Sequence, residues 1–308
     1  MPDQADRKLE IVTAVPESAM VIFAHPDDAE IGSGGVTATW VGAGCDVSYV
    51  LCTNGEAGTA DRALTPEALV RKREQEQRAA ADFMGVRHVE MLGYPDGRLE
   101  DTREFLGDVV RAIRRHRPHT VFVHDPYRIK GFQHRDHRKA GIVTTDAVYP
   151  YARDHLHFAE HITKEGLEPH KVRELWYWGA DEPDVIVDVG PGIDRQIAAL
   201  VRHQSQLPGF NVPEGVTIGE RVKKGAAELG APYGFEYAAC FRRLVARREP
   251  DEAATGPASG VVSRWEARPW PCCRAPAPPT STAASRWRPT SSSPIETGAS
   301  TGATGAST

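Results

Sequence analysis

The chain has 308 residues, of which 40% are hydrophobic and 26% charged, as is typical of a folded globular protein. Its formal net charge of −5 argues against a nucleic-acid partner, because a phosphate backbone binds to a basic surface. The five cysteines form no disulfide pattern, and we find neither an apolar signal region nor an apolar stretch of membrane-spanning length. These features favour a cytoplasmic protein.

Short apolar runs alternate with helical patterns up to about residue 250. The runs predict strands at 19–24, 47–52, 86–92, 120–123, 175–178, 185–189 and 237–244. The patterns between them predict helices at 29–43, 66–84, 102–116, 136–148 and 193–204. This alternation predicts an α/β fold, a doubly wound and mostly parallel Rossmann-like sheet with helices on both faces. Ligands of such sheets bind beyond the carboxyl ends of the strands.

The composition changes sharply at residue 250. Pro, Ser, Thr, Ala and Gly dominate residues 250–308, which cannot bury enough apolar surface to offset the entropy lost on ordering. We therefore expect three parts: an N-terminal extension at 1–17, a folded domain at 18–249, and a disordered tail at 250–308. The unusual composition of the tail would also suit an out-of-frame extension of a GC-rich gene.

The first polar cluster directly follows the first predicted strand. His25, Asp27 and Asp28 lie there, and burying such charges is costly unless they are paired or bound to a metal. The spacing of His25 and Asp28 lets one turn bring both side chains to the same point, and a mixed nitrogen and oxygen donor set suits zinc better than magnesium or calcium. The alternative is that Asp27 or Asp28 caps the following helix.

A second polar cluster follows the fourth predicted strand. His124 ends this strand, and His134, Asp136 and His137 stand where the next helix begins. A third ligand from this cluster would leave one position for water, as in catalytic zinc sites. The alternative is a histidine-rich polar surface. We expect Tyr127, Arg128 and Phe132, which flank the cluster, to line the mouth of a substrate site.

Two further features leave alternatives open. The glycines between Gly32 and Gly35 lack the lysine of a phosphate-binding loop, so we expect them to allow close packing of the first helix. Trp176 and Trp178 alternate along a strand and could belong either to the core or to the wall of a cleft.

The combination of Ala24-His-Pro-Asp-Asp-Ala-Glu30 with His134-Arg-Asp-His137 resembles the PIG-L/LmbE-like family of zinc-dependent N-deacetylases. This family includes N-acetylglucosaminyl-phosphatidylinositol deacetylases and deacetylases of bacterial low-molecular-weight thiol synthesis. The resemblance covers roughly residues 21–244. Supporting matches are Thr53-Asn-Gly-Glu56, Arg73-x-x-Glu76, Tyr94-Pro-Asp-Gly97 and His203-Gln-Ser-Gln206.

The chain departs from the family pattern at two positions. Arg135 stands where proline is common, and Ala239 stands where the late Tyr-Ala-Glu segment has a glutamate. The second change removes a carboxylate, which puts substrate recognition by the C-terminal part in doubt.

The resemblance implies a role for each matching residue. It implies one zinc ion per chain, bound by His25, Asp28 and His137, with iron(II) as an alternative ion. Asp27 would be the general base. His134 would stabilise the oxyanion or protonate the leaving amine, with Asp136 as its partner, and Arg73 would contact the substrate. The resemblance also implies association into trimers or hexamers.

We therefore predict a metal-dependent hydrolase of a linear amide. It would remove an N-acyl group, most simply N-acetyl, from a small amino sugar or sugar conjugate by attack of water. One alternative is an amidase acting on a larger thiol or sugar conjugate. Another is a non-catalytic, metal-containing sugar-binding protein, which would have no need for a base such as Asp27 beside the metal.

Overall fold

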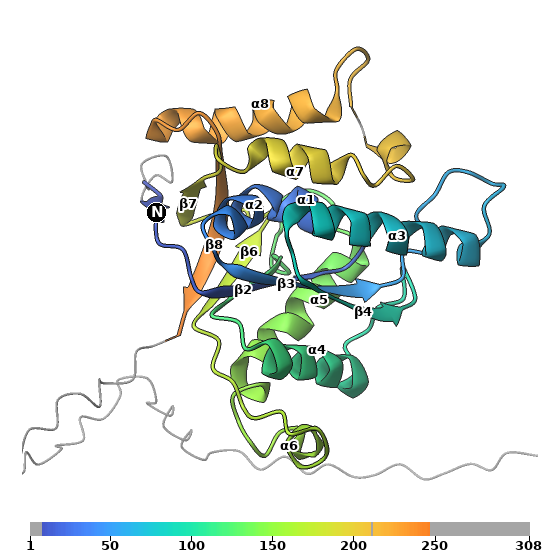
Figure 1. Ribbon diagram of the computed structural model, residues 1–308, viewed down its shortest axis with the longest axis vertical. Helices are drawn as coiled ribbons and strands as arrows, with labels where there is room; N and C mark the ends of the chain where they lie inside the picture. The colour runs from blue at the N-terminus through green and yellow to red at the C-terminus, as the bar shows by residue number, and fades with distance from the viewer. Residues whose placement is uncertain (1–7, 211, 247–308) are drawn as a thin grey trace, which may run out of the picture. The chain divides into compact units, whose positions relative to one another are not determined.

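The computed structural model describes residues 8–210 and 212–246 (Figure 1). Contacts divide the chain into two units, Met1–Pro250 and Asp251–Thr308. The tail predicted for residues 250–308 lies outside the described residues, as do residues 1–7. The division into an extension, a domain and a tail stays a prediction.

One mixed sheet of eight strands forms the centre of the described unit. The strands are β1 (Glu10–Ile11), β2 (Ser18–Phe23), β3 (Asp46–Thr53), β4 (His88–Tyr94), β5 (Thr120–His124), β6 (Glu174–Trp178), β7 (Val185–Asp188) and β8 (Ala238–Val245). Their order is β1-β7-β8-β6-β5-β2-β3-β4, and β8 runs antiparallel to both of its neighbours. The other neighbouring strands run parallel. The predicted α/β class and mostly parallel sheet are therefore confirmed.

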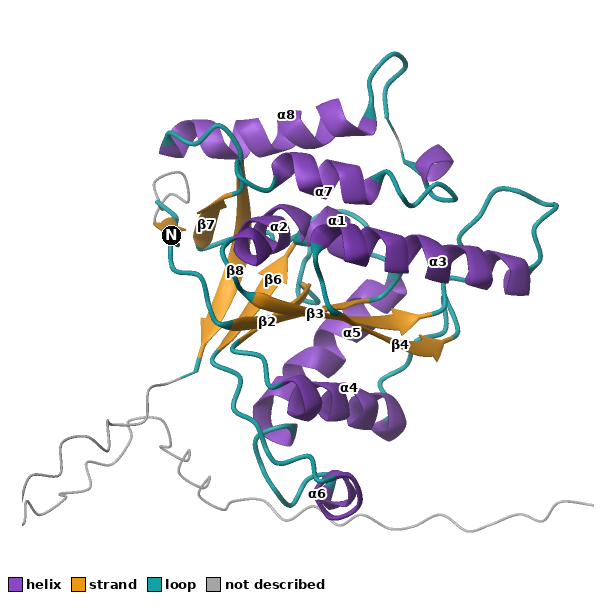
Figure 2. Cartoon of the chain, viewed as in Figure 1, coloured by secondary structure: helices purple, strands orange, loops and turns teal. Residues whose placement is uncertain are grey.

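Helices cover both faces of the sheet, as a doubly wound fold requires (Figure 2). One face carries α1 (Asp28–Gly32), α2 (Gly34–Gly42), α3 (Pro66–Met84), α7 (Ile193–Leu200) and α8 (Ile218–Gly230). The other carries α4 (Arg103–His116), α5 (Arg135–Asp146) and α6 (Ala159–Glu165), with the π-helical turn Ala147–Tyr151 continuing from α5. Short 3-10 turns lie at Leu207–Gly209 and Ala231–Tyr233. Among the residues described, none forms a helix with the length and apolar character that crossing a membrane requires.

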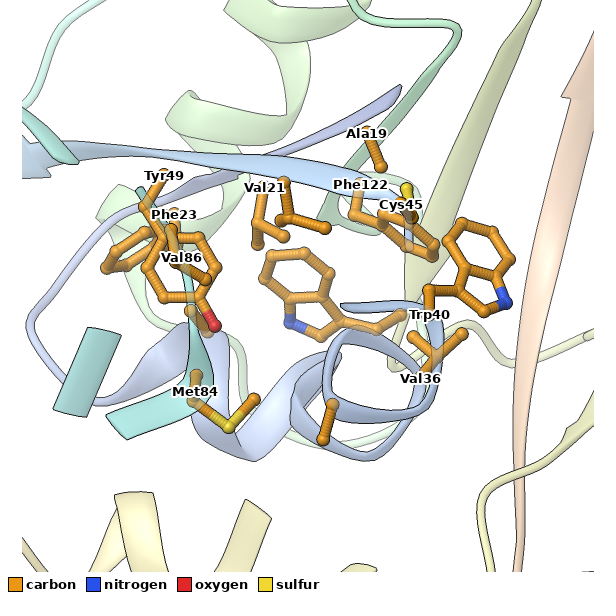
Figure 3. Packing of buried hydrophobic residues seen from close by; sticks show 14 of the residues in the cluster. Ala19, Val21, Phe23, Val36, Trp40, Cys45, Tyr49, Met84, Val86 and Phe122 are labelled. Carbon is orange, nitrogen blue, oxygen red and sulfur yellow. The ribbon is translucent and has the colours of Figure 1, made fainter. Parts of the chain in front are cut away.

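Strand β2 shows how the two hydrophobic cores arise. Because successive side chains of a strand point to opposite faces, Val21 and Phe23 enter one core while Met20 and Ile22 enter the other. Figure 3 shows the first core, where side chains of the strands meet those of the helices in one packed layer. The ring of Phe23 meets that of Tyr49 edge to face at 5.3 Å, a favourable aromatic arrangement.

The point where the chain reverses its direction of travel across the sheet lies between β2 and β5. From β2 the chain moves outward through β3 to β4, and it then returns to place β5 on the other side of β2. Ligands of open α/β sheets bind at the carboxyl ends of the two strands that flank such a point. The two polar clusters begin there, at His25 after β2 and at His124 in β5.

Four elements differ from the sequence-based prediction, and one of them is α6, which was not predicted. The helix expected over 29–43 is two helices that meet at Ser33, where glycines on both sides lower the helix propensity. Gly32 also packs against Trp178, and a Cβ there would lie 2.5 Å from the indole. Helix α8 was not predicted although Thr217 and Glu220 form a capping box at its start. Strand β1 lies within the predicted N-terminal extension and pairs with β7.

Candidate active site

The turn after β2 is held by its own polar groups. Asp28 accepts a hydrogen bond from the backbone N–H of His25 at 2.7 Å through Oδ2. Asp27 adopts a left-handed backbone conformation with φ of 100°, which is uncommon for a residue other than glycine. Neither carboxylate caps α1 through its side chain, so helix capping does not explain why these residues are here.

Ligand-type side chains from both clusters gather into three overlapping groups within the described residues. These groups are His25, His134 and His137; Asp28, His124 and His137; and His25, Asp96 and Asp136. The structure therefore brings the two predicted clusters to one place, and it adds Asp96 to them. A surface-only interpretation of the second cluster does not account for this convergence.

His25, Asp28 and His137 form a compact triangle of donor atoms. Nδ1 of His25 lies 3.2 Å from Nε2 of His137 and 3.3 Å from Oδ2 of Asp28. Nε2 of His137 lies 3.2 Å from Oδ1 of Asp28. Ligands bound to zinc at its usual bond lengths in a tetrahedral site lie about 3.3 Å apart. The triangle therefore fits a metal ion of this type, and its donor set of two imidazoles and one carboxylate suits zinc.

The second ring nitrogen of His25 faces two carboxylates. Its Nε2 lies 3.1 Å from Oδ1 of Asp96 and 3.4 Å from Oδ2 of Asp136. Burial lowers the pKa of His25, but the carboxylates of Asp136, Asp28 and Asp96 outweigh it and raise this pKa to about 11. A carboxylate on the far nitrogen orients a metal-binding histidine and leaves the near nitrogen free for the ion. The contacts of His25 fit this arrangement.

Asp136 has a different partner from the expected one. Its carboxylate accepts backbone N–H groups of Gly97 at 2.7 Å and Leu99 at 3.2 Å, besides facing His25. It was predicted to support His134, but only its backbone N–H reaches that ring. The expected pairing is therefore wrong because the Asp136 side chain points toward the loop that follows β4.

His124 contacts Asp28 but is not one of the three residues of the triangle. Trp178 donates from Nε1 to Nδ1 of His124 at 3.1 Å, which leaves the proton of the neutral ring on Nε2. That Nε2 lies 3.3 Å from Oδ2 of Asp28 and can donate to it. The backbone N–H of Ala24 also approaches Nε2, but at 3.5 Å, so the shorter Trp178 bond decides the tautomer. Burial lowers the pKa of His124 to about 4.

His134 lies at the first turn of α5 and is more exposed than its neighbours. Its Nδ1 accepts the backbone N–H of Asp136 at 3.1 Å and so caps the helix. The proton of the neutral ring is therefore on Nε2. Burial lowers the pKa of His134, and the nearby charges of His25 and His137 lower it further. The ring meets that of His25 edge to face, with centroids 4.5 Å apart.

Asp27 lies beside the triangle in a largely buried position. Burial raises its pKa well above the usual range, the charge of Asp28 adds to this, and the guanidinium of Arg73 opposes it. Its backbone N–H donates to Oε1 of Gln77 at 3.1 Å, and Nε2 of Gln77 donates to Glu30 at 3.2 Å. His203 completes this chain of contacts, since its Nε2 lies 3.1 Å from Oε2 of Glu30 and both side chains are fully buried.

Arg73 lies beneath the turn, where it is only 3% exposed. Its guanidinium donates to the carbonyl of Pro26 at 2.8 Å and to that of Gly55 at 3.0 Å. It also lies 3.9 Å from Asp27 and from Asp96. These contacts are those of a residue that positions the turn, whereas a substrate contact was expected from the sequence.

Some site residues escaped sequence reasoning although a signal was present. Asp96 stands in the quoted Tyr94–Gly97 segment and directly follows a strand, and His124 ends a strand in the same way as His25 follows one. The sequence gives no sign that Gln77 belongs to the site, because the helical pattern around it does not show that its side chain faces the turn. Trp176 and Trp178 both belong to the core, and Trp178 also lines a cavity.

A cavity of about 770 Å³ opens next to this site. Asp28, His124, His134 and His137 line one part of it, together with Arg128 and Phe132 of the loop after β5. Its volume lies in the range of pockets that bind small molecules. Gly32 packs against Trp178 of β6, so the predicted close packing of the first helix on the sheet is confirmed there, whereas Gly34 packs against Gln196 of α7.

Comparison with known proteins adds a family model and several relatives. The model described as PIG-L, GlcNAc-PI de-N-acetylase, matches residues 20–148. A diacetylchitobiose deacetylase of Thermococcus kodakarensis is 31% identical over 192 residues, which span 62% of this chain and 71% of that protein. A 1D-myo-inositol 2-acetamido-2-deoxy-alpha-D-glucopyranoside deacetylase of Segniliparus rotundus is 32% identical over 256 aligned residues, covering 61% of this chain and 77% of that protein.

A solved structure agrees with these relatives. N,N'-diacetylchitobiose deacetylase of Pyrococcus horikoshii superimposes with a TM-score of 0.67 and 27% identity. The match covers 75% of this chain and 84% of that one. The likeness therefore extends over the sheet and helices that carry the site.

Proposed function

Since the chain belongs to the PIG-L family of GlcNAc-PI de-N-acetylases, we propose that it is a metal-dependent N-deacetylase of an amino sugar conjugate. The relatives are named as deacetylases of N-acetylated sugars. The observation that carries the proposal is the triangle of His25, Asp28 and His137 beside the buried Asp27. A metal-binding group next to a carboxylate of raised pKa is the arrangement that hydrolysis of an amide needs.

We infer that His25 through Nδ1, Asp28 through its carboxylate and His137 through Nε2 hold one zinc ion, with iron(II) as the alternative. When bound, the ion polarises the amide carbonyl and makes water a better nucleophile at neutral pH. Asp96 and Asp136 orient His25 from its far side. His124 supports Asp28 by donating from Nε2.

Asp27 moves the proton in this proposal. It takes one proton from the attacking water as the oxygen bonds to the acetyl carbon, and it returns that proton to the nitrogen as the carbon–nitrogen bond breaks. The second proton of the water stays on the acetyl group, so the products are acetic acid and the free amine, and atoms and charges balance. At neutral pH this proton then passes to the amine, which gives acetate and an ammonium group. Its raised pKa makes Asp27 a stronger base than an exposed aspartate and thus suited to both transfers.

His134 stabilises the negative charge that develops on the carbonyl oxygen. Because its Nδ1 accepts from the helix, its Nε2 carries a proton that can be donated to this oxygen. The ring acts as a neutral donor here. Protonation of the leaving amine falls to Asp27, since one donated Nε2 proton cannot serve both atoms.

Two finer parts of the proposal concern the location of the enzyme in the cell and its oligomeric state. We keep the cytoplasmic location and the association with further copies of the chain as predictions. The substrate is a small N-acylated amino sugar or its conjugate. A non-catalytic sugar-binding protein is the competing possibility, and Asp27 discriminates between the two.

The test uses the full-length purified protein and the Asp27→Asn variant. We expect about one zinc per chain by mass spectrometry of metals, and release of amines from N-acetylglucosamine derivatives detected with fluorescamine. A chelator should abolish this release, and added zinc should restore it. Asp27→Asn should retain zinc but lose about a hundredfold or more in kcat, the usual contribution of a positioned acid–base group.

His155→Ala is the matched control, because this exposed histidine lies outside the site. It should leave zinc content and turnover unchanged. Full turnover in Asp27→Asn would contradict the role of Asp27, and a protein that binds no divalent metal would contradict the whole proposal.

A further inference from the structure

The cavity next to the site has two unlike ends. One end presents the polar side chains of Asp28, His124, His134 and His137. The other is walled by α8 and β8, which lie against each other at this edge of the sheet. The N-acetyl group must reach the first end, because the proposed metal ligands Asp28 and His137 and the proposed donor His134 line it. The rest of a substrate is therefore left to face the second end.

The second end is apolar. Val222, Ala226 and Leu229 recur every three or four residues along α8 and so share one helical face. Ala239 and Cys240 of β8 line the same cavity. We call these five residues the α8–β8 wall. Ile31 of α1 lines the cavity as well.

This apolar surface is only partly covered. Val222, Ala226 and Ala239 pack against the core from its edge, and none of the five wall residues is fully buried. Within α8, only Gly230 is buried. Leu229 is 42% exposed, Ile31 is 51% exposed, and Phe132 of the loop after β5 is fully exposed; all three line the cavity. Large apolar side chains that surround a concave surface mark a ligand site more often than an ordinary surface.

The charges near the cavity do not favour an ionic occupant of the α8–β8 wall. The acidic lining residues in the described part of the chain are Asp28 and Asp125, which lie at the polar end. Arg128 donates to the carbonyl of Phe132 at 2.8 Å and so binds within its own loop. Arg221 of α8 also lines the cavity next to Val222, but it is exposed to solvent, which screens its charge. Ala239 contributes only a methyl group to the wall. An acidic or basic side chain at this position would bring a charge into the wall.

We propose that the α8–β8 wall binds an uncharged apolar aglycone of the amino sugar, and that Ala239 is a specificity-determining residue of this enzyme. This inference rests on the proposed deacetylase function. The wall would select N-acetylglucosamine that carries an alkyl or aryl group at its anomeric carbon over the free sugar.

The test compares kcat/KM for deacetylation of the methyl and hexyl glycosides of N-acetylglucosamine with the same anomeric configuration. Burying one methylene group strengthens binding about fourfold. Because the wall is an open surface that covers an alkyl chain from one side, we expect it to bury about half of the five additional methylenes, which gives the hexyl glycoside an advantage of roughly thirtyfold. Equal values for the two glycosides would overturn the inference, whereas no acetate release from either would contradict the proposed function itself.

Two variants assign the preference to the wall. Ala239→Glu and Leu229→Glu each bring a carboxylate into it, and each should reduce the hexyl advantage to less than about threefold because a charge resists burial beside an alkyl chain. Turnover of the methyl glycoside should stay within about twofold, since its aglycone does not reach the wall. Ala227→Glu makes the same change on α8 at a residue that does not line the cavity, and should keep the full advantage.

Two measurements separate other occupants. N-hexanoylglucosamine places the same chain on the acyl side, and a hexyl advantage that appears only with this substrate would overturn the assignment to the aglycone. Sedimentation of wild type and Leu229→Glu reports the oligomeric state. A larger assembly in the wild type that Leu229→Glu dissociates would mean that a second copy covers the wall, and this would also overturn the inference.

Discussion

The turn after β2 and the α8–β8 wall border the same cavity but are held in opposite ways. His25, Asp27 and Asp28 in the turn are each less than a tenth exposed. Gln77, Arg73 and the carboxylates around His25 fix them by short polar contacts. The wall instead lies on α8 and β8, and its apolar side chains are partly exposed. In the proposed enzyme, directional polar contacts hold the reacting groups in place, and non-directional apolar contacts determine which aglycone is preferred.

The difference follows from what each region must do. Binding a metal and moving a proton require atoms held within a few tenths of an ångström, which only a buried and fully bonded shell provides. An apolar aglycone gains affinity in proportion to buried area and tolerates small shifts. We therefore expect substitutions in the turn to change metal binding and kcat, and substitutions in the wall to change selectivity with little effect on stability.

The largest effect is expected from His137→Ala. The side chain of His137 is 25% exposed, so its removal should leave the fold intact while the triangle loses one ligand. Zinc content should fall to a small fraction of one per chain, and turnover should fall about a thousandfold because polarisation by a metal supplies several kcal/mol. Metal analysis and the fluorescamine assay measure both. A variant that keeps its zinc would show that the ion binds through another of the overlapping groups.

The next effect separates ligands from the residues that support them. Asp96→Asn removes a negative charge from the far side of His25 and leaves the three donors in place. The dissociation constant for zinc should rise by about ten- to a hundredfold, the usual cost of losing such a partner. Titration against a competing chelator measures it, and Asp61→Asn on an exposed loop is the control. Unchanged affinity would mean that the turn is fixed without its outer carboxylates.

The sequence predicted the fold better than the contacts within the site. Strand ends and helix caps are local, so α3 with Thr65 at its start and Gly85 at its end lies where its pattern indicates. The convergence of His25 and His137 follows from strand order, and a parallel sheet brings their strand ends together. The direction in which an individual side chain points was harder to predict from the sequence. Asp136 points to His25 because Gly97 and Leu99, distant in sequence, offer it backbone N–H groups.

A smaller effect is expected from Arg73→Lys, which decides between the sequence-based role of Arg73 and its observed contacts. Lysine cannot donate to the carbonyls of Pro26 and Gly55 with the planar geometry of a guanidinium. If Arg73 positions the turn, kcat should fall about tenfold while KM stays within about twofold, because the reacting groups shift slightly. A substrate contact would instead raise KM with kcat unchanged. Arg71→Lys, on the exposed side of α3, controls for the substitution itself.

The smallest effect is expected in the wall. A leucine-to-alanine substitution there can be compared with the same substitution in the core. Leu229→Ala removes a side chain that is 42% exposed, so the free energy of unfolding should fall by less than about 1 kcal/mol. Leu69→Ala removes one that is 0% exposed and should lower it by about 2–5 kcal/mol. Unfolding in urea measures both variants. A loss in Leu229→Ala as large as that in Leu69→Ala would mean that the wall is part of the core, and that its apolar face is kept for stability and not for a ligand.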